Sequence, residues 1–204
     1  MAAAAYRWNA ADTTLADWIE QLAHPGPVFA GGSAAAVAAA EGFALLALGA
    51  GVMERRGNRP SGGPCQGIAT DARTRMHQCL QLAGADARAM AAAWRVHPDD
   101  AELARVLPDD SLRIPLALAE QSVSGLGLLH KLLQRDAGAL VADFRIAALL
   151  LRTALIGALG NARANLGTDA AAGDADGWKE RIDGLAIRGE EMWRRVATLL
   201  GRDR

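Results

Sequence analysis

The sequence predicts an all-α protein, an antiparallel bundle of about six helices that forms one domain over residues 1–204. Hydrophobic residues make up 51% of the chain and aromatic residues only 4%, so Ala, Leu, Val and Ile must fill the interior. This composition favours helix over sheet, and small side chains let helices approach closely. Apolar residues recur at helical spacing, whereas no segment shows the alternation of a strand. No linker-like stretch divides the chain.

Local chemistry sets the expected boundaries of these helices. Thr14 and Asp17 form a capping box ahead of the first helix, and Ser33 is a good N-cap for the second. Asp109 or Asp110 can cap a later helix that carries Pro115 in its first turns, where proline is tolerated. The expected helices span about residues 14–24, 34–53, 68–94, 98–106, 110–133, 139–166 and 178–199.

The helix expected over 34–53 has almost the length and apolarity of a membrane span. We nevertheless expect it to be buried in the bundle, because Ala and Gly dominate it and Glu41 stands near its middle. The other expected helices are amphipathic rather than apolar on all sides. A membrane helix at 34–53 is the competing interpretation.

Charge and cysteine content narrow the class of protein. The 22 basic and 23 acidic residues nearly cancel, which removes the positive charge that binding to nucleic acid requires. The N-terminal segment has no continuous apolar core of a secretory signal. The two cysteines, Cys65 and Cys79, are too few for a disulfide scaffold and suit a reducing compartment. We therefore expect a cytoplasmic protein that binds neither nucleic acid nor membrane.

Most catalytic motifs are missing from the sequence. It has no Gly-rich phosphate loop with its Lys, no Gly-x-Ser-x-Gly elbow and no His-Glu-x-x-His metal pair. The four histidines share no spacing typical of metal ligands, so each is better explained as a surface or packing residue. The sequence therefore predicts no metal site.

Five polar residues stand in otherwise apolar helical segments, and Asp143 is the leading candidate for catalysis among them. A carboxylate between Leu140 and Phe144 should lose solvent on folding, which raises its pKa toward values useful for acid–base chemistry. A helix N-cap or a salt bridge to a neighbouring Arg explains Asp143 about as well. The other four residues are Glu41, Asp86, Asn161 and Asn165.

Two further features could bind a polar ligand. Asn161 and Asn165 lie one helical turn apart on the same face, where they could bind a heterocycle or simply bond at a helix contact. The segment Gly31-Gly32-Ser33 precedes a helix and could offer backbone N–H groups to an anion. An ordinary capping loop has the same sequence pattern, so this segment alone is a weak signal.

Taken in order, these segments resemble the cyclodeaminase/methenyltetrahydrofolate cyclohydrolase family over nearly the whole chain. The family's opening Pro-x-Pro-Gly-Gly-Gly-Ser-Ala is similar to residues 27–34, its Ala-Asp-x-x-Ala-Phe to 85–90, its Val-Pro-Leu to 114–116, its Ser-Asp-Leu to 142–144 and its Asn-x-x-x-Asn to 161–165. The order and spacing of the five matches carry more weight than any one of them. Phe29, Ala30 and Ala142 depart from the family pattern.

The resemblance implies a homodimeric helical bundle that binds a reduced folate or a related pterin in a cleft, without a metal or redox cofactor. Asp143 takes the catalytic position in this comparison. The residues that match substrate-binding positions are Gly31, Gly32, Ser33, Asp86, Asn161 and Asn165.

The activity that the resemblance implies belongs to one-carbon folate metabolism. In the main interpretation the enzyme hydrolyses 5,10-methenyltetrahydrofolate to 10-formyltetrahydrofolate. The alternative is formiminotetrahydrofolate cyclodeaminase, which closes the same ring and releases ammonia. Both reactions pass through a cationic amidinium carbon, so one carboxylate can stabilise charge and move protons. A third interpretation, favoured by the substituted motif residues, is a non-catalytic member that binds a pterin or a partner protein.

Overall fold

The computed structural model describes residues 13–24, 29–56, 67–95, 103–135, 137–166 and 174–201. Within these residues the chain forms six α-helices and one short 3-10 helix, and no strand. The elements are α1 (Leu15–Ala23), α2 (Gly31–Arg56), α3 (Ile68–Arg95), α4 (Leu103–Leu133), η1 (Gly138–Leu140), α5 (Val141–Leu166) and α6 (Ala175–Leu200). The all-α prediction is therefore confirmed.

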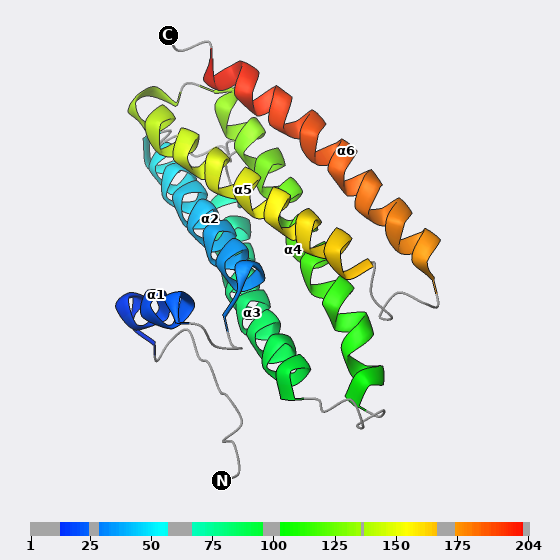
Figure 1. Ribbon diagram of the computed structural model, residues 1–204. Coiled ribbons are helices and arrows are strands. Elements are labelled where there is room, and N and C mark those ends of the chain that lie inside the picture. The colour runs from blue at the N-terminus through cyan, green and yellow to red at the C-terminus, as the bar shows by residue number, and fades with distance from the viewer. Residues whose placement is uncertain are drawn as a thin grey trace.

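Helices α2 to α6 form an up-and-down bundle in which each helix runs antiparallel to the one before it (Figure 1). α2 packs between α3 and α5, and α4 contacts α3, α5 and α6. One continuous core, built mainly from Ala and Leu, joins these helices, with Phe43 and Phe144 among its largest fully buried side chains. Small residues allow this close packing: a Cβ added to Gly42 would lie only 2.9 Å from Cγ of Leu151.

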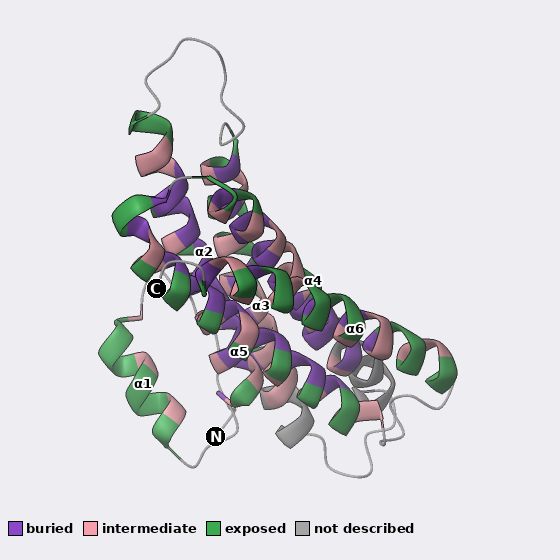
Figure 2. Cartoon of the chain, turned by 90° about the horizontal axis from the view of Figure 1, so that it is seen from above, coloured by how far each residue is buried: buried purple, intermediate pink, exposed green. Residues whose placement is uncertain are grey.

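The first helix stands apart from this bundle (Figures 1 and 2). Its capping box is confirmed, because the Thr14 side chain accepts a hydrogen bond from the Asp17 N–H at 3.1 Å. None of its residues is buried, and Leu15 and Ile19 are more than half exposed. Trp18 meets Phe29 edge to face with ring centroids 6.2 Å apart, which ties α1 to the segment before α2.

α2 satisfies by length and hydropathy the criteria for a membrane span, with a mean hydropathy of 1.8 over its most apolar window. Half of that window is buried inside the bundle, where Ala39, Phe43 and Leu46 are fully enclosed. Glu41 lies on the exposed side of the helix. The prediction that this segment packs as a bundle helix is confirmed, and between residues 31 and 53 Glu41 is the only charged residue on its exposed side.

Two predicted helix boundaries are wrong. α2 begins at Gly31, so Ser33 is not its N-cap but lies in its first turn, fully buried. α4 begins at Leu103 and continues past Pro115, so no separate helix ends at 106 and no new one is capped at 109 or 110. The first residues of the short helix predicted over 98–106 lie outside the described residues.

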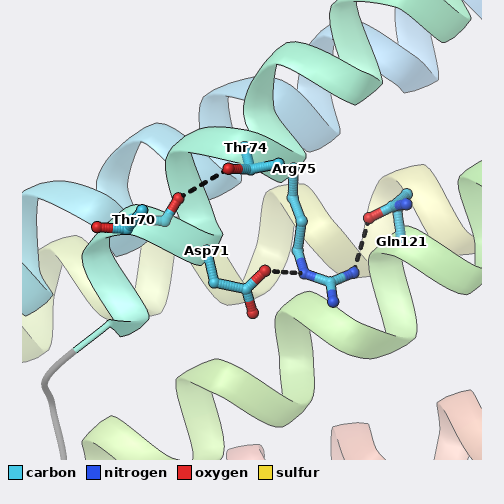
Figure 3. Close-up of polar contacts among 5 residues, drawn as sticks. All are labelled: Thr70, Asp71, Thr74, Arg75 and Gln121. Carbon is cyan, nitrogen blue, oxygen red and sulfur yellow. Dashed lines mark hydrogen bonds and ion pairs between the residues drawn. The ribbon is translucent and has the colours of Figure 1, made fainter.

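Arg75 links α3 to α4 (Figure 3). Its Nε donates to Asp71 Oδ1 at 2.9 Å, and its Nη1 donates to Gln121 Oε1 of α4 at 2.8 Å. One turn along α3, burial raises the pKa of the Cys79 thiol to about 12, against a smaller lowering by Arg75. Cys79 is therefore a packing residue rather than a reactive thiol. Cys65 lies outside the described residues.

Candidate functional site

A pocket of about 300 Å³ opens at the end of the bundle where four helices begin or end. Its lining comes from the segment entering α2, from the second half of α3, from α4 near its proline and from the last turns of α5. The lining residues are Ala30, Gly31, Gly32, Asp86, Ala89, Met90, Ser111, Ile114, Pro115, Asn161 and Asn165. Five of the seven residues predicted from the sequence as site residues are among them.

Asp86 supplies the carboxylate of this pocket. The Ser33 hydroxyl donates to Asp86 Oδ2 at 2.7 Å, and the Ser33 backbone N–H also donates to this carboxylate. Burial raises the pKa of Asp86, and the two hydrogen bonds from Ser33 oppose that rise. Ser33 does not line the pocket, so its predicted role as a substrate contact changes to that of holding Asp86 in place.

Gly32 has no side chain, which leaves space for the Asp86 carboxylate beside the start of α2. A Cβ at position 32 would lie 2.6 Å from Cγ of Asp86, closer than nonbonded carbon atoms can approach. The carboxylate can thus lie directly against the first turn of α2, where backbone N–H groups favour negative charge. A Cβ at Gly31, by contrast, would meet no atom within 4 Å.

Asn165 lines the pocket and supplies a hydrogen bond that α4 lacks. Pro115 has no N–H and therefore cannot donate to the Ser111 carbonyl one turn earlier, as a helical residue would. The Asn165 amide instead donates to Ser111 O at 2.8 Å. This bond explains how α4 accommodates a proline in its interior, and it fixes the end of α5 against α4.

Asn161 has a different role from Asn165, although the two lie one turn apart. It lines the pocket, and its amide makes no hydrogen bond to any described residue. An amide presents both a donor and an acceptor, so Asn161 can bind a polar ligand on either type of group. The predicted pair therefore divides into one structural residue and one residue available for ligand.

Asp143 lies away from this pocket within the same chain. It belongs to the first turn of α5, whereas Asn161 lies 18 residues later, about 27 Å along the helix axis. The prediction that folding buries Asp143 is wrong, since the residue is only partly buried. Successive residues of a helix point in directions about 100° apart, so the neighbours of a residue do not decide its burial. Leu140 and Phe144 are buried, whereas Asp143 is only partly buried.

A second and wider hollow, of about 820 Å³, lies at the opposite end of the bundle, between the end of α4 and the start of α5. Its polar lining consists of Gln134, Arg135 and Arg145, and none of the predicted site residues contributes to it. Among the described residues, no three His, Cys, Asp or Glu side chains are grouped as metal ligands. The smaller pocket with Asp86 is therefore the better candidate for a catalytic site.

Comparison with known proteins identifies the family. Residues 14–182 match the family model described as formiminotransferase-cyclodeaminase. The chain belongs to this family. No curated protein sequence matches it significantly. The resemblance inferred from the sequence motifs is confirmed.

A solved structure of similar fold is the crystal structure of formiminotetrahydrofolate cyclodeaminase from Thermotoga maritima. The two structures align with a TM-score of 0.85, over 95% of this chain and 98% of the other, at 17% sequence identity. At this identity the match shows that the formiminotransferase-cyclodeaminase fold is shared.

Sequence reasoning missed one residue of the site in this family member. Ser111 was not singled out, because the boundary predicted at 109 or 110 placed it at the start of a helix. The Pro115 that follows one turn later was the available signal, since a proline inside a helix requires a donor from elsewhere for the carbonyl at 111.

Proposed function

We propose that the protein is an enzyme of one-carbon folate metabolism and that it acts as a formiminotetrahydrofolate cyclodeaminase. The observation that carries this proposal is Asp86, a carboxyl group whose burial raises its pKa in a pocket that also presents the unbonded amide of Asn161. A raised pKa makes the carboxylate a stronger base, which suits it to accept a proton and return it during a reaction. The family match and the activity named for the Thermotoga protein support the choice of reaction.

In the proposed reaction N10 of the folate attacks the formimino carbon on N5 and forms the second carbon–nitrogen bond of the ring. Asp86 as carboxylate accepts the proton released from N10 and donates it to the departing nitrogen. The bond from carbon to that nitrogen then breaks, and ammonia leaves. The product is the 5,10-methenyl cation, and its positive charge is carried through from the protonated formimino group. The carboxylate stabilises this charge while it moves the proton.

Hydrolysis of 5,10-methenyltetrahydrofolate to the 10-formyl compound is the second candidate. Water would add to the methenyl carbon, and Asp86 would accept one proton of that water and pass it to N5. The carbon–N5 bond would then break as the formyl C=O forms, and the remaining hydroxyl proton would leave to solvent. The free amide of Asn161 favours this candidate, because it can hold a water molecule in the pocket. Neither reaction needs a metal or redox cofactor, so we propose none.

One assay distinguishes the two reactions, because both involve the absorbance of the methenyl compound. We expect this absorbance to rise when the protein is given 5-formiminotetrahydrofolate, faster than in buffer. Under the second candidate it falls when the protein is given the methenyl compound. Asp86→Asn keeps the acceptor for Ser33 but cannot move a proton, so turnover should fall by about a hundredfold or more. Rates equal to buffer in both directions would favour the non-catalytic interpretation.

A further inference from the structure

The hollow of about 820 Å³ at the end of the bundle away from Asp86 has a positively charged lining. Its two charged residues are Arg135, just after α4, and Arg145, in the second turn of α5. No Asp or Glu lines the hollow in the part of the chain that the structure describes. Asp143 cannot neutralise Arg145, because helical residues two apart lie on different sides of the helix. The hollow therefore carries two uncompensated guanidinium groups.

Two other cavities of the bundle have a different charge. In the groove of about 270 Å³ between α5 and α6, Arg152 Nη2 lies 3.9 Å from Glu190 Oε2. Arg163, in the same groove, lies 3.8 Å from Asp183 through its Nη2 and Oδ1 of the acid. The described lining of the other pocket contains Asp86 and no cation. Uncompensated positive charge thus distinguishes the 820 Å³ hollow from both.

A hydrogen bond fixes Arg145 at the wall of this hollow. Its Nη2 donates to the Leu200 carbonyl at the end of α6, at 3.1 Å. This bond uses one of the five N–H groups of a guanidinium, so further donors remain for a ligand. A side chain that is already held in place loses less conformational entropy when it binds. Gln134 adds an amide to the same lining, and its NH₂ group can also donate.

We propose that this hollow binds a small organic phosphate. A phosphate monoester carries a charge of about −1.5 to −2 at neutral pH, which matches two guanidinium groups. Its three terminal oxygens can accept from both arginines and from Gln134, whereas a carboxylate offers two oxygens.

The size and the apolar part of the hollow suit the organic portion of such a ligand. Its volume of about 820 Å³ is within the range of small-molecule sites and far exceeds that of a phosphate group. Leu133, Val141 and Leu199 are among the lining residues and can contact an apolar group attached to the phosphate. The ligand is therefore a phosphate ester with an apolar portion rather than free phosphate.

Isothermal titration calorimetry with phenyl phosphate at constant ionic strength tests the site. We expect saturable binding, about tenfold or more tighter than that of benzoate, which joins the same ring to a carboxylate. Arg135→Gln and Arg145→Gln should each weaken the binding of phenyl phosphate about tenfold or more, because each removes a charged hydrogen-bond donor. Arg188→Gln is the matched control, since Arg188 is exposed on α6 and does not line the hollow. Its affinity should equal that of the wild type.

A folding defect is separated from a loss of binding by Arg135→Gln. Arg145→Gln also removes the bond to Leu200, whereas the Arg135 side chain makes no hydrogen bond or ion pair with any described residue. Arg135→Gln should therefore keep the wild-type Tm while it loses affinity. Equal affinities of the wild type and the two hollow variants would overturn the site, as would a wild type that binds no phenyl phosphate. Equal affinity for benzoate would overturn the assignment to phosphate.

The test does not depend on the proposed function. Asp86 lies at the other end of the bundle, so Asp86→Asn should bind phenyl phosphate as tightly as the wild type does. A tenfold weaker binding by Asp86→Asn would contradict the placement of the phosphate in this hollow. Wild-type protein that binds phenyl phosphate but acts on no folate contradicts the proposed function and supports the phosphate site.

Discussion

Asp86 lies where burial disfavours the charged form of its carboxyl group. A charged Asp86 should therefore lower the free energy of unfolding. The folded protein has a raised pKa at Asp86, so it binds the proton more tightly than the unfolded chain does. Stability from this group is therefore greatest below its ordinary pKa of 3.8 and is lost as pH rises through the folded-state value. The same rise in pKa that lowers the stability of the folded protein at neutral pH makes Asp86 more suitable for proton transfer.

We expect Asp86→Asn to be more stable than the wild type at pH 7, because asparagine carries no charge to desolvate and still accepts from Ser33. The advantage should shrink as the pH is lowered through the raised pKa of Asp86, because the wild-type carboxyl then becomes neutral. Urea unfolding of the two proteins between pH 4 and pH 7 measures this difference. A variant less stable than the wild type at pH 7 contradicts the role of burial at Asp86.

The two asparagines of α5 should respond differently to the same substitution. Asn165→Ala removes the donor to Ser111 O and should lower the free energy of unfolding by about 1–2 kcal/mol. Asn161→Ala removes no hydrogen bond to a described residue and should change it by less than about 0.5 kcal/mol, while weakening ligand binding. Chemical unfolding and ligand titration of both variants measure these effects. Equal losses of stability would contradict the division of roles.

At this scale the sequence predicted part of the group of residues that meet, but not what each of them does. Asp86, Asn161 and Asn165, predicted from the order of family motifs, do line one pocket. Their roles depend on partners distant in sequence: Ser33 is 53 residues from Asp86, and Ser111 is 54 residues from Asn165. No local pattern shows such pairs. Nor could the sequence show that Asp143 faces away from the core, because that depends on the rotation of α5.

Among the helices, glycines in α2 provide the close approach to α5. Gly49→Ala places a methyl group against the buried ring of Phe144, whose Cζ would lie 2.5 Å away. We expect a loss of about 1–3 kcal/mol in the free energy of unfolding, because the ring has no free space to enter. Gly51→Ala is the matched control: its Cβ meets nothing within 4 Å, so helix propensity alone should stabilise by about 0.5–1 kcal/mol.

Thermal or urea unfolding of the two alanine variants gives the comparison directly. Opposite signs are expected although both substitutions lie in one helix, two residues apart. A loss of stability at both positions would show that the Phe144 contact does not decide the result.

The helices themselves were predictable because their apolar periodicity is long and regular, and the capping box at Thr14 fixes a boundary by local hydrogen bonds. Boundaries set by tertiary contacts were not predictable. Ser33 has the chemistry of an N-cap, but its hydroxyl bonds Asp86 on α3 instead, and α2 begins two residues earlier. α4 continues through Pro115 because a side chain of α5 takes over the missing bond.

In the whole molecule, α2 explains why the sequence resembled a membrane span. Its inner side is buried by the bundle, and on its outer side Leu48 is half exposed, so apolar residues occur on both sides of the helix. Helical periodicity is weak when apolar residues occur on both sides of a helix. The sequence alone does not show which of the two sides the bundle buries.

The pocket is lined by parts of four helices, so a ligand that binds there should stabilise the bundle as a unit. A ligand that binds only the folded state adds about 2.7 kcal/mol at a concentration of 100 Kd. For a chain of this size we therefore expect a reduced folate to raise the Tm by about 5–10 °C. Differential scanning calorimetry with tetrahydrofolate derivatives measures the shift. Asn161→Ala, which should melt like the wild type without ligand, is the matched control and should show a smaller shift. The absence of any shift at saturating reduced folate would contradict the assignment of this pocket to folate.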